Sequence, residues 1–192
     1  MHGYLKTLPF IALMAIAAPL SAQEDDGAAA GGLSLGEPAE AEGQPFIKEE
    51  IDDWKLECVK LPDGSEPCQM FQALLDQEDN QVANVRFFRL PEGSRAVAGA
   101  VVSVPLETLL TAQLTIQVDD NPAKRYPFSV CDQMGCYARI GFTQEDIDTF
   151  KGGKTATVSL VPFVAPDQRV NLDMSLLGFT ASYDKTSVLT PQ

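Results

Sequence analysis

The stretch that decides how this chain folds is Arg125-Tyr126-Pro127-Phe128-Ser129-Val130-Cys131-Asp132-Gln133-Met134-Gly135-Cys136-Tyr137-Ala138-Arg139-Ile140. Its first half alternates Tyr126, Phe128 and Val130 with less apolar neighbours, which is the period-two pattern of a half-buried strand. Gly135 supplies the backbone freedom that a short return requires. A second apolar run then extends from Cys136 to Phe142. The stretch therefore predicts two strands joined by a tight loop that a pair of cysteines can close.

Cys58, Cys68, Cys131 and Cys136 are all the cysteines of the chain. An even number in an exported protein predicts disulfides, and four cysteines allow three connectivities. We favour Cys58–Cys68 and Cys131–Cys136, because each pair flanks a turn-rich loop. A four-cysteine zinc site is the alternative, although the first pair lacks the usual short ligand spacing. The spacing of Cys131 and Cys136 also differs from that of the two-residue redox motif, which argues against a thiol–disulfide protein.

The first residues have the features of an export signal. Lys6 gives a positive start, and an almost unbroken apolar run from Leu8 to Leu20 is too short to span a membrane. Leu20-Ser21-Ala22 then offers a small-residue cleavage site, so residues 1–22 are predicted to be a signal peptide. A buried N-terminal helix is the alternative, but no polar face interrupts the run. We expect no transmembrane segment in the mature chain, and export to the periplasm or cell surface of a Gram-negative bacterium.

The mature chain is predicted to have a leader, one domain and a short tail. Residues 23–50 are rich in Ala, Gly and Glu, with a single Lys48, and predict a disordered acidic linker. Residues 51–186 suffice for one core, and residues 187–192 are expected to be a tail. Cleavage would leave 13 basic and 27 acidic residues, a net charge of −14. Such a charge repels nucleic acid.

The domain predicts an all-β fold, mainly antiparallel. Short apolar runs alternate with turn signals such as Pro62-Asp63-Gly64-Ser65 and Pro91-Glu92-Gly93-Ser94, as in a β-sandwich. One short helix is expected, beginning at a capping pattern at Thr143 and ending at Gly152-Gly153. Phe87-Phe88 places one aromatic on each face of a strand. One of them is expected in the core, and the other, with Leu90, on a surface that a partner can bind.

Few catalytic chemistries are open to the mature chain. Its only histidine, His2, leaves with the signal peptide, which excludes Ser-His-Asp and Cys-His pairs and histidine-ligated metals. Ser182-Tyr183-Asp184-Lys185 matches the S-x-x-K motif but lacks its companion motifs, so we interpret it as an exposed chain end. We interpret Asp63 and Asp119-Asp120-Asn121 as turns, because no complete calcium-binding loop is present. We predict no catalytic, cofactor-binding or metal-binding residue.

An ordered set of short motifs resembles the invasion-associated locus B family of exported bacterial proteins. The set covers nearly the whole domain and comprises Trp54-Lys55-Leu56-Glu57-Cys58, Cys68-Gln69, Val104-Pro105-Leu106 with Leu109, Gln117-Val118-Asp119, Pro127-Phe128 ahead of Cys131, Gly135-Cys136-Tyr137-Ala138, Phe150-Lys151-Gly152 and Ser175-Leu176-Leu177-Gly178-Phe179. Between Pro105 and Gln117 the chain departs from the family, which often has glycines there.

The resemblance implies an immunoglobulin-like β-sandwich, secretion across the inner membrane and, in some members, a virulence-associated role in host-cell invasion. It implies no catalytic residues. Our first hypothesis is a non-enzymatic envelope protein that binds a protein or envelope partner. The alternatives are a periplasmic hydrolase that uses two carboxylates on glycan, which needs no histidine, and a thiol–disulfide protein.

Overall fold

The computed structural model describes residues 28–29, 33–34, 43–93 and 95–189 of a chain that divides into two compact units, Met1–Glu40 and Ala41–Gln192. In the first unit, β1 (Ala28–Ala29) pairs antiparallel with β2 (Leu33–Ser34). The predicted signal peptide lies outside the described residues, as does much of the predicted linker. The second unit contains all the other elements.

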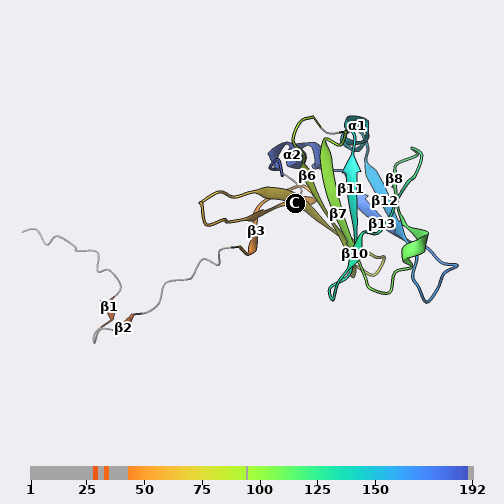
Figure 1. The fold of residues 1–192 in the computed structure, drawn as a ribbon, viewed down its shortest axis with the longest axis horizontal. Helices are drawn as coiled ribbons and strands as arrows, with labels where there is room; N and C mark the ends of the chain where they lie inside the picture. The colour runs from red at the N-terminus through yellow and green to blue at the C-terminus, as the bar shows by residue number, and fades with distance from the viewer. Residues whose placement is uncertain (1–27, 30–32, 35–42, 94, 190–192) are drawn as a thin grey trace, which may run out of the picture. The chain divides into compact units, whose positions relative to one another are not determined.

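Seven antiparallel strands form the larger sheet of the second unit, in the order β10-β11-β7-β6-β5-β4-β3 (Figure 1). Short turns join β3 through β7, so strands that follow one another in sequence are also neighbours in the sheet. Glycines with positive φ, Gly64 and Gly93, lie in two of these turns, where the sequence predicted them. The strands are β3 (Pro45–Ile51), β4 (Trp54–Val59), β5 (Cys68–Leu75), β6 (Gln81–Arg89), β7 (Ala98–Val104), β10 (Val130–Cys131) and β11 (Cys136–Phe142).

Four antiparallel strands form the smaller sheet, in the order β13-β12-β8-β9. They are β8 (Leu114–Val118), β9 (Lys124–Tyr126), β12 (Thr155–Leu160) and β13 (Val170–Ser175), and a 3-10 helix, η1 (Leu110–Ala112), precedes β8. Inward side chains of both sheets, such as Val102 on β7 and Leu172 on β13, belong to one buried cluster. The two sheets therefore share a core, and the predicted antiparallel β-sandwich is confirmed.

Aromatic rings fill the centre of this core. Phe87 is fully buried, and its ring centroid is 5.2 Å from that of Phe142 and 5.4 Å from that of Phe179. Aromatic pairs at such distances contribute about 0.5–1.5 kcal/mol each beyond the area that they bury. Trp54 packs edge-on against Phe87 and donates its indole N–H to the carbonyl of Ser175 at 3.0 Å, which ties the larger sheet to the smaller one.

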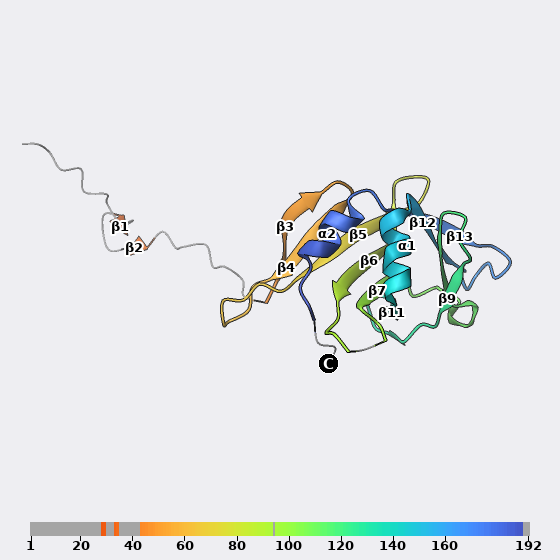
Figure 2. The same cartoon turned by 90° about the horizontal axis from the view of Figure 1, so that it is seen from above.

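Two helices cover one end of the sandwich, side by side in the view from above (Figure 2). The first, α1 (Gln144–Gly152), begins at the predicted capping box, in which Thr143 and Asp146 satisfy each other's backbone N–H groups. The second, α2 (Phe179–Lys185), corrects the prediction of a single helix. Its buried residues Phe179, Ser182 and Tyr183 have the i, i+3, i+4 spacing of a helix that packs one face on a core.

In the first half of residues 125–140, the structure differs from the prediction. Tyr126 ends β9 in the smaller sheet, whereas Val130 begins β10 in the larger one. The chain therefore changes sheets around Pro127, a residue that has no N–H to contribute to a strand ladder. The prediction of one continuous strand over residues 125–130 is wrong. The tight loop and the second strand, which ends at Phe142, are confirmed.

Both boundaries of the domain lie outside the ones that the sequence predicted. The predicted linker extended to residue 50, but Pro45–Ile51 forms β3 and pairs with β4. The predicted tail began at residue 187, but Ser187 and Leu189 donate backbone hydrogen bonds to Cys68 and Arg89. Residues 190–192 lie outside the described part of the chain. The domain is therefore longer at each end than the sequence predicted.

Candidate interaction surface

A disulfide closes the hairpin of β10 and β11. Cys131 and Cys136 are directly opposite each other in the strand register and are bonded through their sulfurs. Between them, Oδ1 of Asp132 accepts hydrogen bonds from the backbone N–H groups of Met134 at 2.7 Å and Gly135 at 3.2 Å, and from the hydroxyl of Tyr137 at 3.0 Å. The hydrogen bond from Met134 is the main cause of the lowered pKa of Asp132. The loop is thus organised around one carboxylate.

Two further connections meet this hairpin. The segment after β7 is hydrogen-bonded to the segment after β12, because Leu109 N–H donates to the carbonyl of Val161 and Phe163 N–H donates to that of Glu107, each at 2.8 Å. The hydroxyl of Thr108 is buried and donates to the carbonyl of Pro105 at 2.7 Å. A shallow pocket of about 480 Å³ is lined by residues 106–111, by both cysteines of the hairpin and by Phe163.

Large apolar side chains are exposed on these three segments. Phe163 and Val164 are 67% and 74% exposed, and Met134, in the disulfide loop, is 86% exposed. Figure 1 shows the three connections at the lower end of the sandwich, opposite the helices. We call this group the apolar end, and it consists of Leu106, Leu110, Val130, Met134, Phe163 and Val164. Leu106, Leu110 and Phe163 line the same pocket, and exposed apolar side chains that gather in this way mark interaction sites in soluble proteins.

The sequence did not predict the apolar end. The strand β12 ends at Leu160, ahead of Phe163 and Val164, and Leu106 lies in the connection from β7 to β8. The available signal was Pro162, because a proline inside an apolar run marks the end of a strand. The exposure itself depends on three loops that are distant in sequence.

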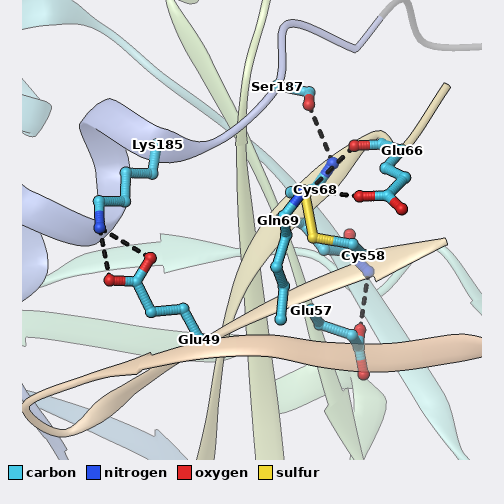
Figure 3. The surroundings of a disulfide bond; sticks show 9 residues. Glu49, Glu57, Cys58, Glu66, Cys68, Gln69, Lys185 and Ser187 are labelled. Atoms are coloured by element: carbon cyan, nitrogen blue, oxygen red, sulfur yellow. Dashed lines mark hydrogen bonds and ion pairs between the residues drawn. A yellow bond between two sulfur atoms is a disulfide. The ribbon is translucent and has the colours of Figure 1, made fainter. Parts of the chain in front are cut away.

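The second disulfide serves the opposite edge of the larger sheet. Cys58 and Cys68 are register partners on β4 and β5, and the bridge is buried (Figure 3). The backbone N–H of Cys68 donates to the hydroxyl of Ser187 at 2.9 Å, so the end of the domain is held against the bridge. Lys185 contacts both carboxylate oxygens of Glu49, which joins α2 to β3. These contacts hold the end of the domain against the larger sheet. All four cysteines are bonded in disulfides.

A polar cleft of about 660 Å³ between β5 and β13 bears on the hypothesis of a carboxylate mechanism. Asp53, Asp76 and Asp173 line it. Asp53 accepts a hydrogen bond from the hydroxyl of Ser175 at 2.5 Å. Hydrogen bonds from Asn80 and Glu78 lower the pKa of Asp76, whereas a general acid in glycoside hydrolysis needs a raised pKa. Asp76 is therefore poorly suited to act as that acid.

The remaining candidates have structural positions. Ser182 is fully buried on α2 and its hydroxyl has no hydrogen-bond partner, so the interpretation of this segment as an exposed chain end is wrong. The carboxylate of Asp119 accepts from the backbone N–H groups of Lys154 and Thr155, each at 3.0 Å, and Asp63 accepts from Ser65, so both are turn residues as predicted. Among the described residues, no group of three or more acidic, cysteine or histidine side chains could hold a metal ion.

Comparison with known proteins gives a consistent result. The family model described as "Invasion associated locus B (IalB) protein" matches residues 54–187. Two proteins named "Invasion protein B homolog", from Brucella abortus strain 2308 and from biovar 1 strain 9-941, are each 26% identical over 148 residues, which is 77% of this chain and 83% of theirs. The crystal structure of invasion associated protein B from Bartonella henselae has a similar fold, with a TM-score of 0.59 and 20% identity over 69% of this chain and 89% of that one.

Within the described residues, no helix is long and apolar enough to cross a membrane.

Proposed function

The chain belongs to the invasion associated locus B family, and from this premise we propose that it is an exported, non-enzymatic envelope protein that works by binding another protein through its apolar end. The exposure of Met134, Phe163 and Val164 carries the proposal. Two disulfides support export, because such bonds persist in oxidising compartments. The relatives are named for invasion, and we extend to this chain a role in contact between the envelope and another surface.

A protein fits the apolar end better than a lipid surface does. The exposed side chains of Glu107 and Asp132 lie on the same loops as the apolar group. An apolar centre with a charged rim is the usual composition of a protein interface. The chain is also acidic as a whole, and anionic lipid would repel it.

The bonding of the cysteines and the burial of Ser182 support the non-enzymatic part of the proposal. The four cysteines are bonded in pairs, and Ser182 is buried beneath the surface of α2. The polar cleft, which is lined by three aspartates, is where the carboxylate alternative is tested. Release of reducing ends from an envelope glycan, abolished by Asp53→Asn with the melting temperature unchanged, would overturn this part of the proposal.

The binding proposal is tested with fluorescently labelled full-length mature protein and envelopes of the producing bacterium. We expect saturable binding that is lost when the envelopes are first treated with protease, and no binding to protein-free lipid vesicles. Met134→Ser together with Phe163→Ser should weaken binding at least tenfold, because exposed apolar residues at the centre of an interface contribute on the order of 1–2 kcal/mol each.

Leu177→Ser is the matched control, because Leu177 is 62% exposed but lies next to α2, away from the apolar end. It should bind like the unmodified protein, and both variants should keep its melting temperature. Equal loss in both variants, or binding that survives protease and is reproduced by lipid vesicles, would contradict a protein partner at the apolar end.

A further inference from the structure

A second hollow lies on the outward face of the larger sheet, away from the apolar end. Residues that are paired across neighbouring strands share a face of the sheet. Phe88 on β6 is opposite Gly99 on β7, and Gly99 is opposite Gly141 on β11. Phe87 faces the core and Phe88 faces away from it, as the alternation predicted. The residues in register with Phe88 therefore lie on the outward face of the sheet.

Phe88 covers Gly99, whereas Gly141 is exposed and leaves the hollow open. A Cβ atom on Gly99 would lie 2.5 Å from the ring of Phe88, so the ring rests directly on the backbone of β7. A Cβ on Gly141 would meet only the Cβ of Ala96, at 3.1 Å. The resulting space of about 470 Å³ is within the range of small-molecule sites. Its floor is Gly141 and Val101, and its walls include Phe88, Leu90 and Arg139.

The charge of the hollow is opposite to that of the protein. Arg139 is exposed and pairs in register with Val101, whose other neighbour is Arg86. Arg86 is neutralised by Glu57 at 2.7 Å. Arg139 has no such ion pair with any carboxylate of the described residues, and no carboxylate lines the hollow. An apolar floor thus adjoins one available guanidinium group in a chain of net charge −13.

We propose that this hollow binds a small amphiphilic carboxylate. Its apolar chain would lie over Gly141 and Val101, against Phe88 and Leu90, where it loses contact with water. Its carboxylate would accept two parallel hydrogen bonds from the guanidinium of Arg139, the geometry that arginine offers to planar anions. The site stands apart from the apolar end and does not depend on the binding function proposed for it.

The test uses octanoate as the probe and octan-1-ol as its uncharged counterpart, each titrated into the isotopically labelled mature protein. Backbone amide resonances report where each compound binds. We expect octanoate to shift the resonances of Gly99, Val101, Arg139 and Gly141, and octan-1-ol to shift the same set with affinity on the order of tenfold lower. That ratio corresponds to one charge-assisted hydrogen-bonded pair.

Two variants separate the charge from the shape. Arg139→Gln should weaken octanoate on the order of tenfold and leave octan-1-ol unchanged, because only the carboxylate contact is lost. Gly141→Val should weaken both compounds, because its side chain occupies the floor. Arg125→Gln on β9 and Ser103→Val on β7 are the matched controls, and both should bind like the unmodified protein.

Three outcomes would overturn the proposal. Octanoate that shifts no resonance at this face, or only those around Leu110 and Phe163, would show that the hollow is not the site. Equal binding of octanoate and octan-1-ol would remove the role of Arg139. If both Arg139→Gln and Gly141→Val kept the spectrum of the folded protein and the unmodified affinity for octanoate, octanoate would not bind in the hollow.

Discussion

At the scale of single side chains, Glu57 is a nearly buried carboxylate that forms an ion pair with Arg86 on the larger sheet. Its side chain is 10% exposed, and it accepts hydrogen bonds from Arg86 at 2.7 and 3.2 Å and from Gln69 at 2.9 Å. Burial alone would raise the pKa of Glu57, but the hydrogen bonds and the charge of Arg86, with the bond from Gln69, lower it below its ordinary value of 4.5. Arg86 also lies over the ring of Phe71. The pair therefore stabilises the ionised form of Glu57.

We predict that Glu57→Gln lowers the free energy of unfolding by about 1–3 kcal/mol at pH 7, the usual cost of losing hydrogen bonds to a charged partner. The pKa of Glu57 is lower in the folded than in the unfolded state, so its contribution is present above pH 4.5 and is lost as the pH falls through the folded-state value. Urea unfolding between pH 3 and 7 measures this, and the variant should lose less stability on acidification.

Glu50→Gln is the control for this experiment, because Glu50 pairs with Lys55 at 3.2 Å but is 66% exposed. Exposed pairs contribute little, so the change should be below about 1 kcal/mol. Identical losses in the two variants would mean that burial of Glu57 has no energetic consequence.

Among the elements, the hairpin of β10 and β11 links stability to the proposed function. Its strand β10 has two residues and only a short ladder, so the bridge of Cys131 and Cys136 and the carboxylate of Asp132 must hold the loop. The loop in turn presents Met134, and the cysteines line the pocket beside Phe163. Loss of the bridge should therefore affect both the fold and the surface.

We predict that Cys131→Ser with Cys136→Ser lowers the melting temperature by about 5 °C and weakens envelope binding without unfolding the domain. The closed loop is short, so the bridge is expected to contribute about 2 kcal/mol, which corresponds to a few degrees in a domain of this size. Differential scanning calorimetry with the binding assay measures both effects. An unchanged melting curve would contradict the stabilising role of the bridge.

For the whole molecule, the chain from residue 41 onward is one unit whose two sheets share a core. The edge strand β3 lies ahead of the residues that match the family, yet it covers β4 and is joined to α2 through Glu49 and Lys185. An uncovered sheet edge invites pairing with another chain. We therefore infer that β3 protects β4, whose backbone would otherwise be the exposed edge of the larger sheet.

We predict that a chain starting at residue 41 melts in one transition at the temperature of the mature protein. A chain starting at residue 53 lacks β3 and leaves β4 unpaired, so it should self-associate at concentrations where the longer chain is monomeric. Calorimetry and analytical ultracentrifugation make the comparison. If the two chains behaved alike, β3 would have no protective role.

Local sequence patterns were sufficient to predict the elements that depend on interactions between neighbouring residues. The start of α1 follows from a capping box within four residues, and β11 follows from alternation between Cys136 and Phe142. The same reasoning failed at α2, whose buried Phe179, Ser182 and Tyr183 have helical spacing in a segment too short to be recognised without its packing partners. It also failed at Pro127, where the alternation continues although the chain changes sheets.

The amino-acid order alone was enough to predict an all-β domain with four cysteines and no imidazole after cleavage, because periodicity, turn residues and composition are properties of neighbouring positions. The folded chain decided the rest. The apolar end gathers three loops separated by up to about sixty residues, and the hollow beside Gly141 needs β6, β7 and β11 in one register. Exposure and proximity arise from the packing of distant segments, and no window of sequence contains them.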